Sequence, residues 1–123
     1  MKLPFVYVRV AAKEHGTKKL IEGDLKPGQH VVLIEDLLST GGSAVSSVDA
    51  LRCEGRATVS DVIAIFTYDF LSAREAAQTH NVQFHPLTTI DVLLKTAVGQ
   101  NRISEEEADM VIAFVRNPQG WGK

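Results

Sequence analysis

The sequence has few features of a secreted, membrane-bound or nucleic-acid-binding protein. Its single cysteine, Cys53, excludes an internal disulfide and a cysteine-rich metal cluster. No apolar run approaches the length needed to span a bilayer, and the opening residues do not form a signal peptide. The net charge of -2 offers no basic surface for nucleic acid. We therefore expect a cytoplasmic protein with no nucleic-acid or membrane partner, and Cys53 buried in a helix.

Length and patterning indicate a single domain over residues 1–123. With 45% hydrophobic and 23% charged residues, the chain can bury a modest core. Strand patterns alternate with helical patterns, which predicts an α/β fold with a parallel sheet flanked by helices and right-handed crossovers. Its binding site is expected at the carboxyl ends of the strands.

The most informative stretch is His30–Ser43, which reads H-V-V-L-I-E-D-L-L-S-T-G-G-S. The unbroken aliphatic run Val31–Ile34 predicts a strand buried on both faces of a parallel sheet. The acidic pair Glu35-Asp36 follows directly. Next come the small polar residues Ser39–Ser43, and then a helical pattern over Ser43–Glu54. The predicted order is therefore strand, acidic pair, small polar loop and helix.

This loop has the properties of a phosphate site. Gly41 and Gly42 can adopt positive φ and lack a Cβ, so that backbone N–H groups can turn toward an anion. The helix that follows adds unsatisfied donors and the positive end of its dipole. Thr40 and Ser43 can donate hydroxyl hydrogen bonds to the same oxygens. No lysine follows the glycines, which disfavours a P-loop nucleotide triphosphatase.

The acidic pair indicates a second binding function. Glu35 and Asp36 would repel a phosphate if they faced it, so they are expected to serve another part of the ligand. Vicinal sugar hydroxyls or a hydrated Mg²⁺ are suitable partners for them. A strand, a glycine turn and a helix are common in α/β proteins, and the carboxylates make this one more specific. We predict a ligand that carries both a phosphate and a ribose.

The N-terminal quarter combines a strand with a basic segment. Leu3–Arg9 has the pattern of a strand, and Val10–Leu25 has the composition of an exposed, mobile loop. Its cationic and histidine side chains could neutralise a polyanion, or they could simply be solvated. They are Lys13, His15, Lys18 and Lys19.

Further elements follow from caps and turn residues. Lys26–Gln29 predicts a turn, and Val59–Tyr68 and Val82–Leu87 predict strands. Helices are expected over Ser72–His80, over Thr88–Val98 with a threonine cap, and from a capping box at Ser104 to about Arg116. His80 and His85 flank a strand without neighbouring ligands, so exposed or hydrogen-bonded histidines are favoured over a metal site.

Three stretches resemble one enzyme family. His30–Ser43 resembles the phosphoribosyl pyrophosphate (PRPP) signature of type I phosphoribosyltransferases, with its strand, two acidic residues and T-G-G-S. The stretch F-V-Y-V-R-V-A-A-K-E-H-G-T-K-K-L-I-E-G, from Phe5 to Gly23, resembles the catalytic loop of orotate phosphoribosyltransferases, and the closing R-N-P-Q-G-W-G-K resembles some of their tails. The resemblance implies a partial type I phosphoribosyltransferase fold that lacks the family's usual N-terminal portion.

The resemblance also implies a reaction and a set of site residues. The reaction is Mg²⁺-dependent transfer of the 5-phosphoribosyl group from PRPP to orotate, giving orotidine 5'-monophosphate and pyrophosphate. Lys13 and Asp36 are implied as catalytic, and Thr40 as close to orotate. Mg²⁺ is implied to arrive with PRPP and not through a direct protein site, with Glu35 and Asp36 as the candidate residues to assist it. The implied PRPP-binding residues are Arg9, Lys13, His15, Glu35, Asp36, Leu37, Leu38, Ser39, Thr40, Gly41, Gly42 and Ser43.

Departures from the family pattern leave alternatives open. Val10 stands where the family usually has a second lysine, and the arginine expected near Asp69 is missing because Arg74 lies too far into a helical pattern. A non-catalytic PRPP- or nucleotide-binding remnant and a transferase for another base are the alternatives. The family's loop reaches into a neighbouring subunit, which implies a homodimer. A chain without the family's N-terminal portion would also expose a sheet edge and part of its core, and could associate with that missing half.

Overall fold

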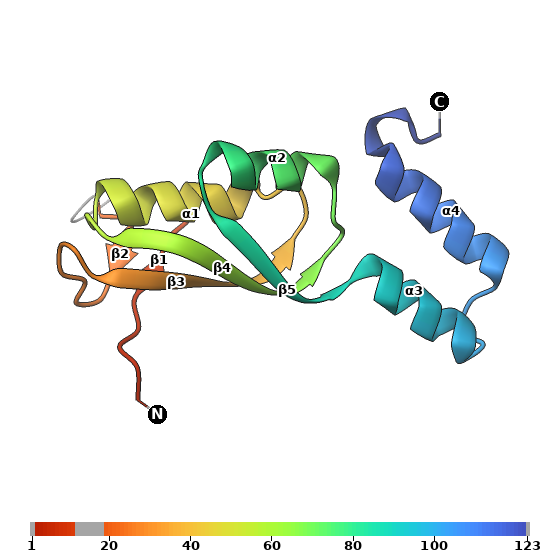
Figure 1. Cartoon of the computed structure of the whole chain (residues 1–123), viewed down its shortest axis with the longest axis horizontal. Coiled ribbons are helices and arrows are strands. Elements are labelled where there is room, and N and C mark those ends of the chain that lie inside the picture. The colour runs from red at the N-terminus through yellow and green to blue at the C-terminus, as the bar shows by residue number, and fades with distance from the viewer. Residues whose placement is uncertain (1, 12–18, 123) are drawn as a thin grey trace.

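The computed structural model describes residues 2–11 and 19–122, and its centre is a parallel sheet of three strands. The strands are β3 (His30–Leu38), β4 (Thr58–Thr67) and β5 (Gln83–Thr89), in the order β3-β4-β5. Helices α1 (Gly42–Cys53) and α2 (Leu71–Thr79) connect them and lie along one face of the sheet (Figure 1). The predicted α/β class with a parallel sheet is confirmed.

Two further helices follow the sheet. α3 (Ile90–Gly99) and α4 (Glu105–Arg116) form a hairpin beyond the carboxyl end of β5, and the 3-10 turn η1 (Pro118–Gly120) follows (Figure 1). The hairpin is held by a small apolar cluster around Ile90 and Leu94 of α3 and Ala108 of α4.

The predicted caps of these two helices are present. The Thr89 hydroxyl accepts a hydrogen bond from the Val92 N–H, which starts α3. At the start of α4, the Ser104 hydroxyl accepts from the Glu107 N–H while the Glu107 carboxylate accepts from the Ser104 N–H. Local sequence therefore predicted a threonine cap and the capping box, because each cap depends only on residues within one turn, but α3 begins at Ile90 and not at the predicted Thr88.

The N-terminal elements are shorter than predicted. β1 (Tyr7–Val8) pairs antiparallel with β2 (Ile21–Glu22), and this hairpin is separate from the main sheet. The predicted strand Leu3–Arg9 was thus too long. The predicted loop Val10–Leu25 was wrong at Ile21–Glu22, which form β2. Strand assignment here required a partner strand, which the local pattern did not reveal.

The main core lies between the sheet and α1. Val48 and Leu51 of α1 pack with Val62 and Ala64 of β4, and all four are buried. Cys53 is exposed, so the prediction of a buried thiol was wrong. Helical spacing explains the error: residues 44, 48 and 51 form the buried stripe, and position 53 falls outside it.

Neither α1 nor α2 lies over the opposite face of the sheet (Figure 1). This bare face presents apolar side chains from all three strands, so the prediction that Val31–Ile34 is buried on both faces was wrong. Burial alternates along this part of β3 because α1 and α2 both lie on the same side. The exposed fractions are Val32 52%, Ile34 63%, Ile65 57% and Leu87 74%. No helix in the described ranges is long and apolar enough to cross a membrane.

Candidate functional site

The acidic pair lies within β3 rather than after it. Because successive strand residues point to opposite faces, Glu35 shares the half-buried side with Val31 and Leu33, whereas Asp36 is exposed on the bare face. Partial burial, and then the charge of Asp36, raise the pKa of the Glu35 carboxyl above its ordinary value of 4.5. The two carboxylates therefore have different environments and cannot act as one chelating pair.

This donor set is suited to a magnesium ion carried by a ligand. The described residues contain no group of three or more metal-binding side chains, so they offer no complete cage. Mg²⁺ usually keeps several waters and is held by one or two carboxylates together with substrate phosphates. Single carboxylates on β3 fit that kind of binding.

The loop after β3 depends on one glycine. Gly41 has φ 82°, a left-handed conformation that disfavours other residues. A Cβ at this position would lie 3.2 Å from a ring carbon of Phe84 and 3.4 Å from the Cα of Ala73. Gly42 does not adopt positive φ and instead begins α1. Only the first of the two glycines thus has the predicted conformation.

The start of α1 is open. Its N-cap, Gly41, has no side chain to cap it, and the Thr40 hydroxyl accepts the Gly42 N–H only at 3.5 Å, the long limit of a hydrogen bond. The first N–H groups of a helix have no partner within the helix, and together with the dipole they favour an anion. The start of α2 is also uncapped, whereas α3 and α4 have side-chain caps. The open start of α1 follows the carboxyl end of β3 directly, where a ligand site was predicted.

The predicted loop residues differ in how they can reach a ligand. The Leu38 side chain is 2% exposed and belongs to the core, and its carbonyl accepts hydrogen bonds from the Tyr68 N–H and the Thr67 hydroxyl. Leu37 is exposed. Thr40 and Ser43 are also exposed, so their hydroxyls are accessible from solvent.

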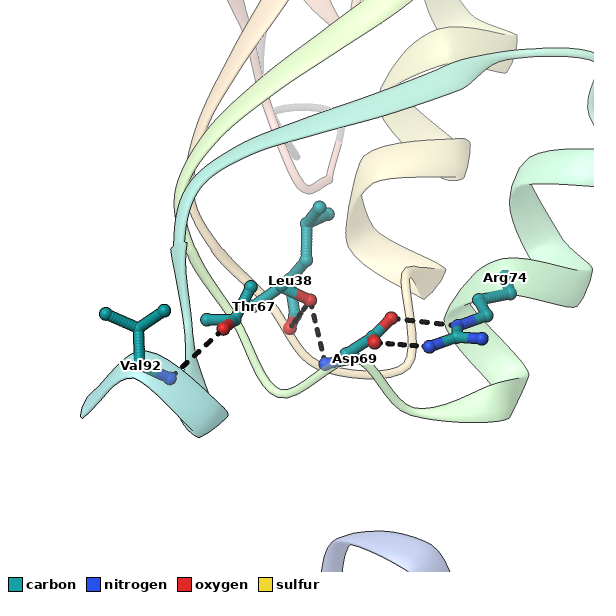
Figure 2. A network of polar contacts seen from close by, with 6 residues as sticks. Leu38, Thr67, Asp69, Arg74 and Val92 are labelled. Carbon is teal, nitrogen blue, oxygen red and sulfur yellow. Dashed lines mark hydrogen bonds and ion pairs between the residues drawn. The ribbon is translucent and has the colours of Figure 1, made fainter. Parts of the chain in front are cut away.

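The end of β4 lies beside this loop (Figure 2). The hydroxyl of Thr67, at the end of β4, donates to the Leu38 carbonyl and accepts the Asp69 N–H at 2.9 Å. Thr67 therefore connects Leu38 to Asp69. Arg74 reaches from α2 back to Asp69 and donates to both of its carboxylate oxygens, and this pairing raises the pKa of the Arg74 guanidinium. Arg74 therefore lies closer to the strand end than the helical pattern suggested. Asp69 and Arg74 border a cavity of about 450 Å³ between α2 and β5.

Arg9 lies apart from this edge of the sheet. Its backbone N–H donates to the Leu20 carbonyl, and its guanidinium pairs with Glu22 across the β1–β2 hairpin. That hairpin contacts Glu54, which ends α1. Because α1 has 12 residues, its two ends are about 18 Å apart. Within one molecule, therefore, Arg9 lies at the far end of α1 from the Thr40–Ser43 loop. Lys13 and His15, the other cationic predictions, lie outside the described residues.

His80 precedes β5, whereas His85 lies within it rather than beside it as predicted, and both have carboxylate partners. His80 Nδ1 lies 3.2 Å from Asp49, and His85 Nε2 lies 2.7 Å from Asp61. The preference for hydrogen-bonded histidines over a metal site agrees with these contacts.

Two residues with tertiary roles escaped the sequence predictions. Arg52, half-buried on α1, donates to the carbonyls of His80, Val59 and Asn81, which joins α1 to β4 and to the α2–β5 turn. Glu54 accepts two backbone N–H groups from the β1–β2 hairpin. One local feature could have drawn attention to Glu54. It is an acidic residue at a helix C-terminus, where the helix dipole disfavours a negative charge unless another group compensates it.

Comparison with known proteins supports one family consistently. No protein-family model matches the chain. An orotate phosphoribosyltransferase of Listeria monocytogenes serotype 4b (strain F2365) is 41% identical over 123 residues, which are 100% of this chain and 58% of that protein. One from Bacillus caldolyticus is 43% identical over 122 residues, covering 99% of this chain and 59% of that protein. The chain thus spans about three fifths of the length of these curated relatives.

Solved structures support the same relationship. Leishmania donovani UMP synthase superimposes with a TM-score of 0.75 at 27% identity, over 92% of this chain and 24% of that chain. Orotate phosphoribosyltransferase from Aeropyrum pernix superimposes with a TM-score of 0.64 at 30% identity, over 76% of this chain and 51% of that chain. The sheet and helices described above are those of a type I phosphoribosyltransferase. Over its whole length, therefore, the chain is related in sequence and fold to the orotate phosphoribosyltransferases.

Proposed function

We propose that this chain serves in pyrimidine biosynthesis by transferring the 5-phosphoribosyl group of PRPP to orotate, which yields orotidine 5'-monophosphate and pyrophosphate. The observation that carries the proposal is the open start of α1 behind Gly41, at the carboxyl end of β3. The relationship of the whole chain to orotate phosphoribosyltransferases supports it further.

The loop and α1 would hold the 5'-phosphate. The first backbone N–H groups of α1 point out of the helix and have no partner within it. The exposed hydroxyls of Thr40 and Ser43 add two donors beside them. This combination favours a phosphate dianion. Thr40 would also lie close to orotate.

The acidic pair would serve the ribose. Positive charge develops on the sugar ring as the bond from C1 to pyrophosphate breaks, and a nearby carboxylate stabilises such charge. Asp36, exposed on the bare face within β3, is suited to the ribose hydroxyls, and Glu35 would act separately from the opposite, half-buried side of the strand. Mg²⁺, when bound, would neutralise charge on the pyrophosphate of PRPP, with Asp36 or Glu35 able to accept hydrogen bonds from its waters.

The basic N-terminal residues would stabilise the departing pyrophosphate. The proposal assigns this role to Arg9, Lys13 and His15, with Lys13 and Asp36 as the catalytic residues. In the described structure Arg9 pairs with Glu22 at the far end of α1, so it would have to exchange that partner for an anion. A second copy of the chain could present this hairpin to the loop of the first. We therefore propose a homodimer as the active form.

The bare face of the sheet offers a second reason to expect association. Four apolar side chains on it are at least half exposed, and parallel sheets are normally covered on both faces. A second copy, or a polypeptide equivalent to the part of the relatives that this chain does not span, could cover it. Light scattering over a range of protein concentrations tests this. Ile34→Lys should reduce association, whereas Met110→Lys, which changes an exposed apolar residue of α4, should not.

Calorimetric titration with PRPP and Mg²⁺ tests the site itself. The wild-type chain should bind saturably, and Asp36→Asn should weaken binding by about tenfold because it removes the carboxylate charge beside the ribose. Asp109→Asn, which alters an exposed carboxylate on α4, is the matched control and should bind like wild type. Absence of any PRPP binding would overturn the proposal.

An orotate turnover assay on the same sample separates the enzyme from the alternative. Val10, in place of the second lysine of the family pattern, favours a chain that binds PRPP or a nucleotide without catalysis. Binding without turnover of any base would support that reading. Turnover of uracil or a purine in place of orotate would identify a transferase for another base. The single cysteine supports a reducing, cytoplasmic setting for either activity.

A further inference from the structure

The C-terminal end of α1 holds the hairpin that carries Arg9. One carboxylate, that of Glu54, accepts hydrogen bonds from two consecutive backbone N–H groups. Its Oε2 lies 3.0 Å from the Leu20 nitrogen and its Oε1 lies 3.2 Å from the Ile21 nitrogen. Each oxygen has its own donor, so the contact fixes both the position and the direction of this backbone segment.

This contact is not what the helix alone would favour. Glu54 follows the last turn of α1, where the negative end of the dipole opposes a carboxylate. The hydrogen bonds to the hairpin are charge-assisted, and they offset that unfavourable interaction. The position of Glu54 is therefore explained by the hairpin rather than by α1.

Packing beside Glu54 brings the two elements into close contact. A Cβ on Gly55 would lie 2.5 Å from Leu25 Cδ2 and 3.0 Å from Ile21 Cδ1. It would also lie 2.7 Å from the backbone carbonyl oxygen of Leu51, which cannot move aside as the end of a side chain can, so the position requires glycine. The hairpin is thus held against the end of α1 by the hydrogen bonds to Glu54 and by apolar contacts beside Gly55.

The held segment leads directly to Arg9. Ile21 pairs with Val8 across the hairpin, and the Leu20 carbonyl accepts the Arg9 N–H at 2.7 Å. The Arg9 guanidinium in turn pairs with Glu22, the residue after Ile21. Movement of Leu20 and Ile21 would therefore change where Arg9 is presented.

From these contacts we infer that Glu54 is a positioning residue for Arg9. It acts on anion binding only through the hairpin and touches neither substrate nor reacting atoms. The inference rests on the proposed function, in which Arg9 binds the pyrophosphate part of PRPP.

Two measurements on the full chain test it. The first is amide hydrogen exchange at Leu20 and Ile21, which should accelerate by about tenfold in Glu54→Ala. The Tyr68 amide, which donates to the Leu38 carbonyl far from the hairpin, is an internal reference and should not change. Glu54→Gln retains a carbonyl acceptor and should have an intermediate effect. Glu106→Ala, on the exposed first turn of α4, is the matched control.

The second measurement is calorimetric affinity for PRPP with Mg²⁺ in a double-mutant cycle. Glu54→Ala should weaken binding about tenfold in the wild-type background and have no further effect in an Arg9→Ala background. Equal weakening in both backgrounds would mean that Glu54 does not act through Arg9, and would overturn the inference.

The two measurements also distinguish this inference from the proposed function. If wild type does not bind PRPP, the proposed function fails, and exchange at Leu20 and Ile21 still decides whether Glu54 positions the hairpin. Unchanged exchange in Glu54→Ala would overturn the inference whatever the affinity. Wild-type PRPP binding that is unaffected by Glu54→Ala would overturn it while leaving the proposed function standing.

Discussion

Helices α1 and α4 are both 12 residues long, yet they begin in opposite ways. α4 starts with a complete capping box, in which Ser104 and Glu107 satisfy each other's backbone donors. α1 starts behind a left-handed glycine, and no described side chain caps it. The first arrangement closes a helix end for stability, and the second leaves backbone donors free for a ligand. The uncapped start of α1, at the carboxyl end of β3, is therefore a better indication of a binding site than the helix as a whole.

The largest effect is expected from breaking the open end at Gly41. Gly41→Ala places a side chain in a left-handed conformation and within 3.2 Å of Phe84. We expect PRPP affinity to fall at least about tenfold and the free energy of unfolding to fall by roughly 2 kcal/mol. Calorimetry and urea denaturation measure the two effects.

Gly99→Ala is the control for that substitution. Gly99 ends α3, lacks a positive φ, and a Cβ there would meet nothing within 4 Å. It should leave PRPP affinity unchanged. Equal affinity loss in both variants would show that the effect of Gly41 is not specific to the open end.

The opposite end of α1 provides the next test. Arg52→Met removes a guanidinium that donates to three carbonyls of other elements. Because half-buried carbonyls would lose a charged partner, the free energy of unfolding should fall by about 2 kcal/mol. Urea denaturation measures this, with Arg116→Met in the last turn of α4 as the control. A loss no larger than that of the control would show that Arg52 does not anchor α1.

Removal of the α4 cap should have a smaller effect, confined to stability. Ser104→Ala deletes the hydroxyl that accepts the Glu107 N–H, so the free energy of unfolding should fall by about 1 kcal/mol. PRPP affinity should not change. Thermal unfolding and calorimetry together measure the two quantities. Weakened PRPP binding would contradict the view that the start of α4 serves only stability while the start of α1 binds the ligand.

The smallest expected effect concerns Glu35, just before the open end. Its folded-state pKa is raised above the ordinary 4.5, so the folded protein holds this proton more tightly than the unfolded chain does. The resulting stabilisation is complete below pH 4.5 and is lost as pH rises through the folded pKa. Wild type should therefore lose stability relative to Glu35→Gln over that window.

Urea midpoints at a series of pH values measure this difference. Glu106→Gln, on the exposed first turn of α4, is the control. A wild-type to Glu35→Gln difference that stays constant with pH would show that burial of Glu35 does not affect its protonation.

Much of the fold was accessible from sequence because it depends on short-range rules. The caps at Thr89 and Ser104 need only residues three positions away, and α2 and β4 were predicted to within one residue. The turn at Gly41 also follows from local chemistry. The family resemblance, carried by the acidic pair and T-G-G-S, agreed with the relatives found by comparison.

Other features required contacts between distant residues. The exposure of Val32 and Ile34 depends on which face α1 and α2 cover, and no pattern within β3 reports that. The distance of Arg9 from the loop depends on where the hairpin packs, which Glu54 and Gly55 decide. Arg74 meets Asp69 only because the turn between β4 and α2 brings them together.

The sequence by itself thus determined the parallel α/β class, the four helices, the existence of the three main strands, and the caps of α3 and α4. These follow from backbone conformation and hydrogen bonding within a few residues. Only the tertiary structure decided that Glu35 and Asp36 lie on opposite sides of a strand, that Cys53 is exposed, and that Glu54 at the end of α1 binds the β1–β2 hairpin. Such features arise from packing between elements, whose energies depend on partners far away in the chain.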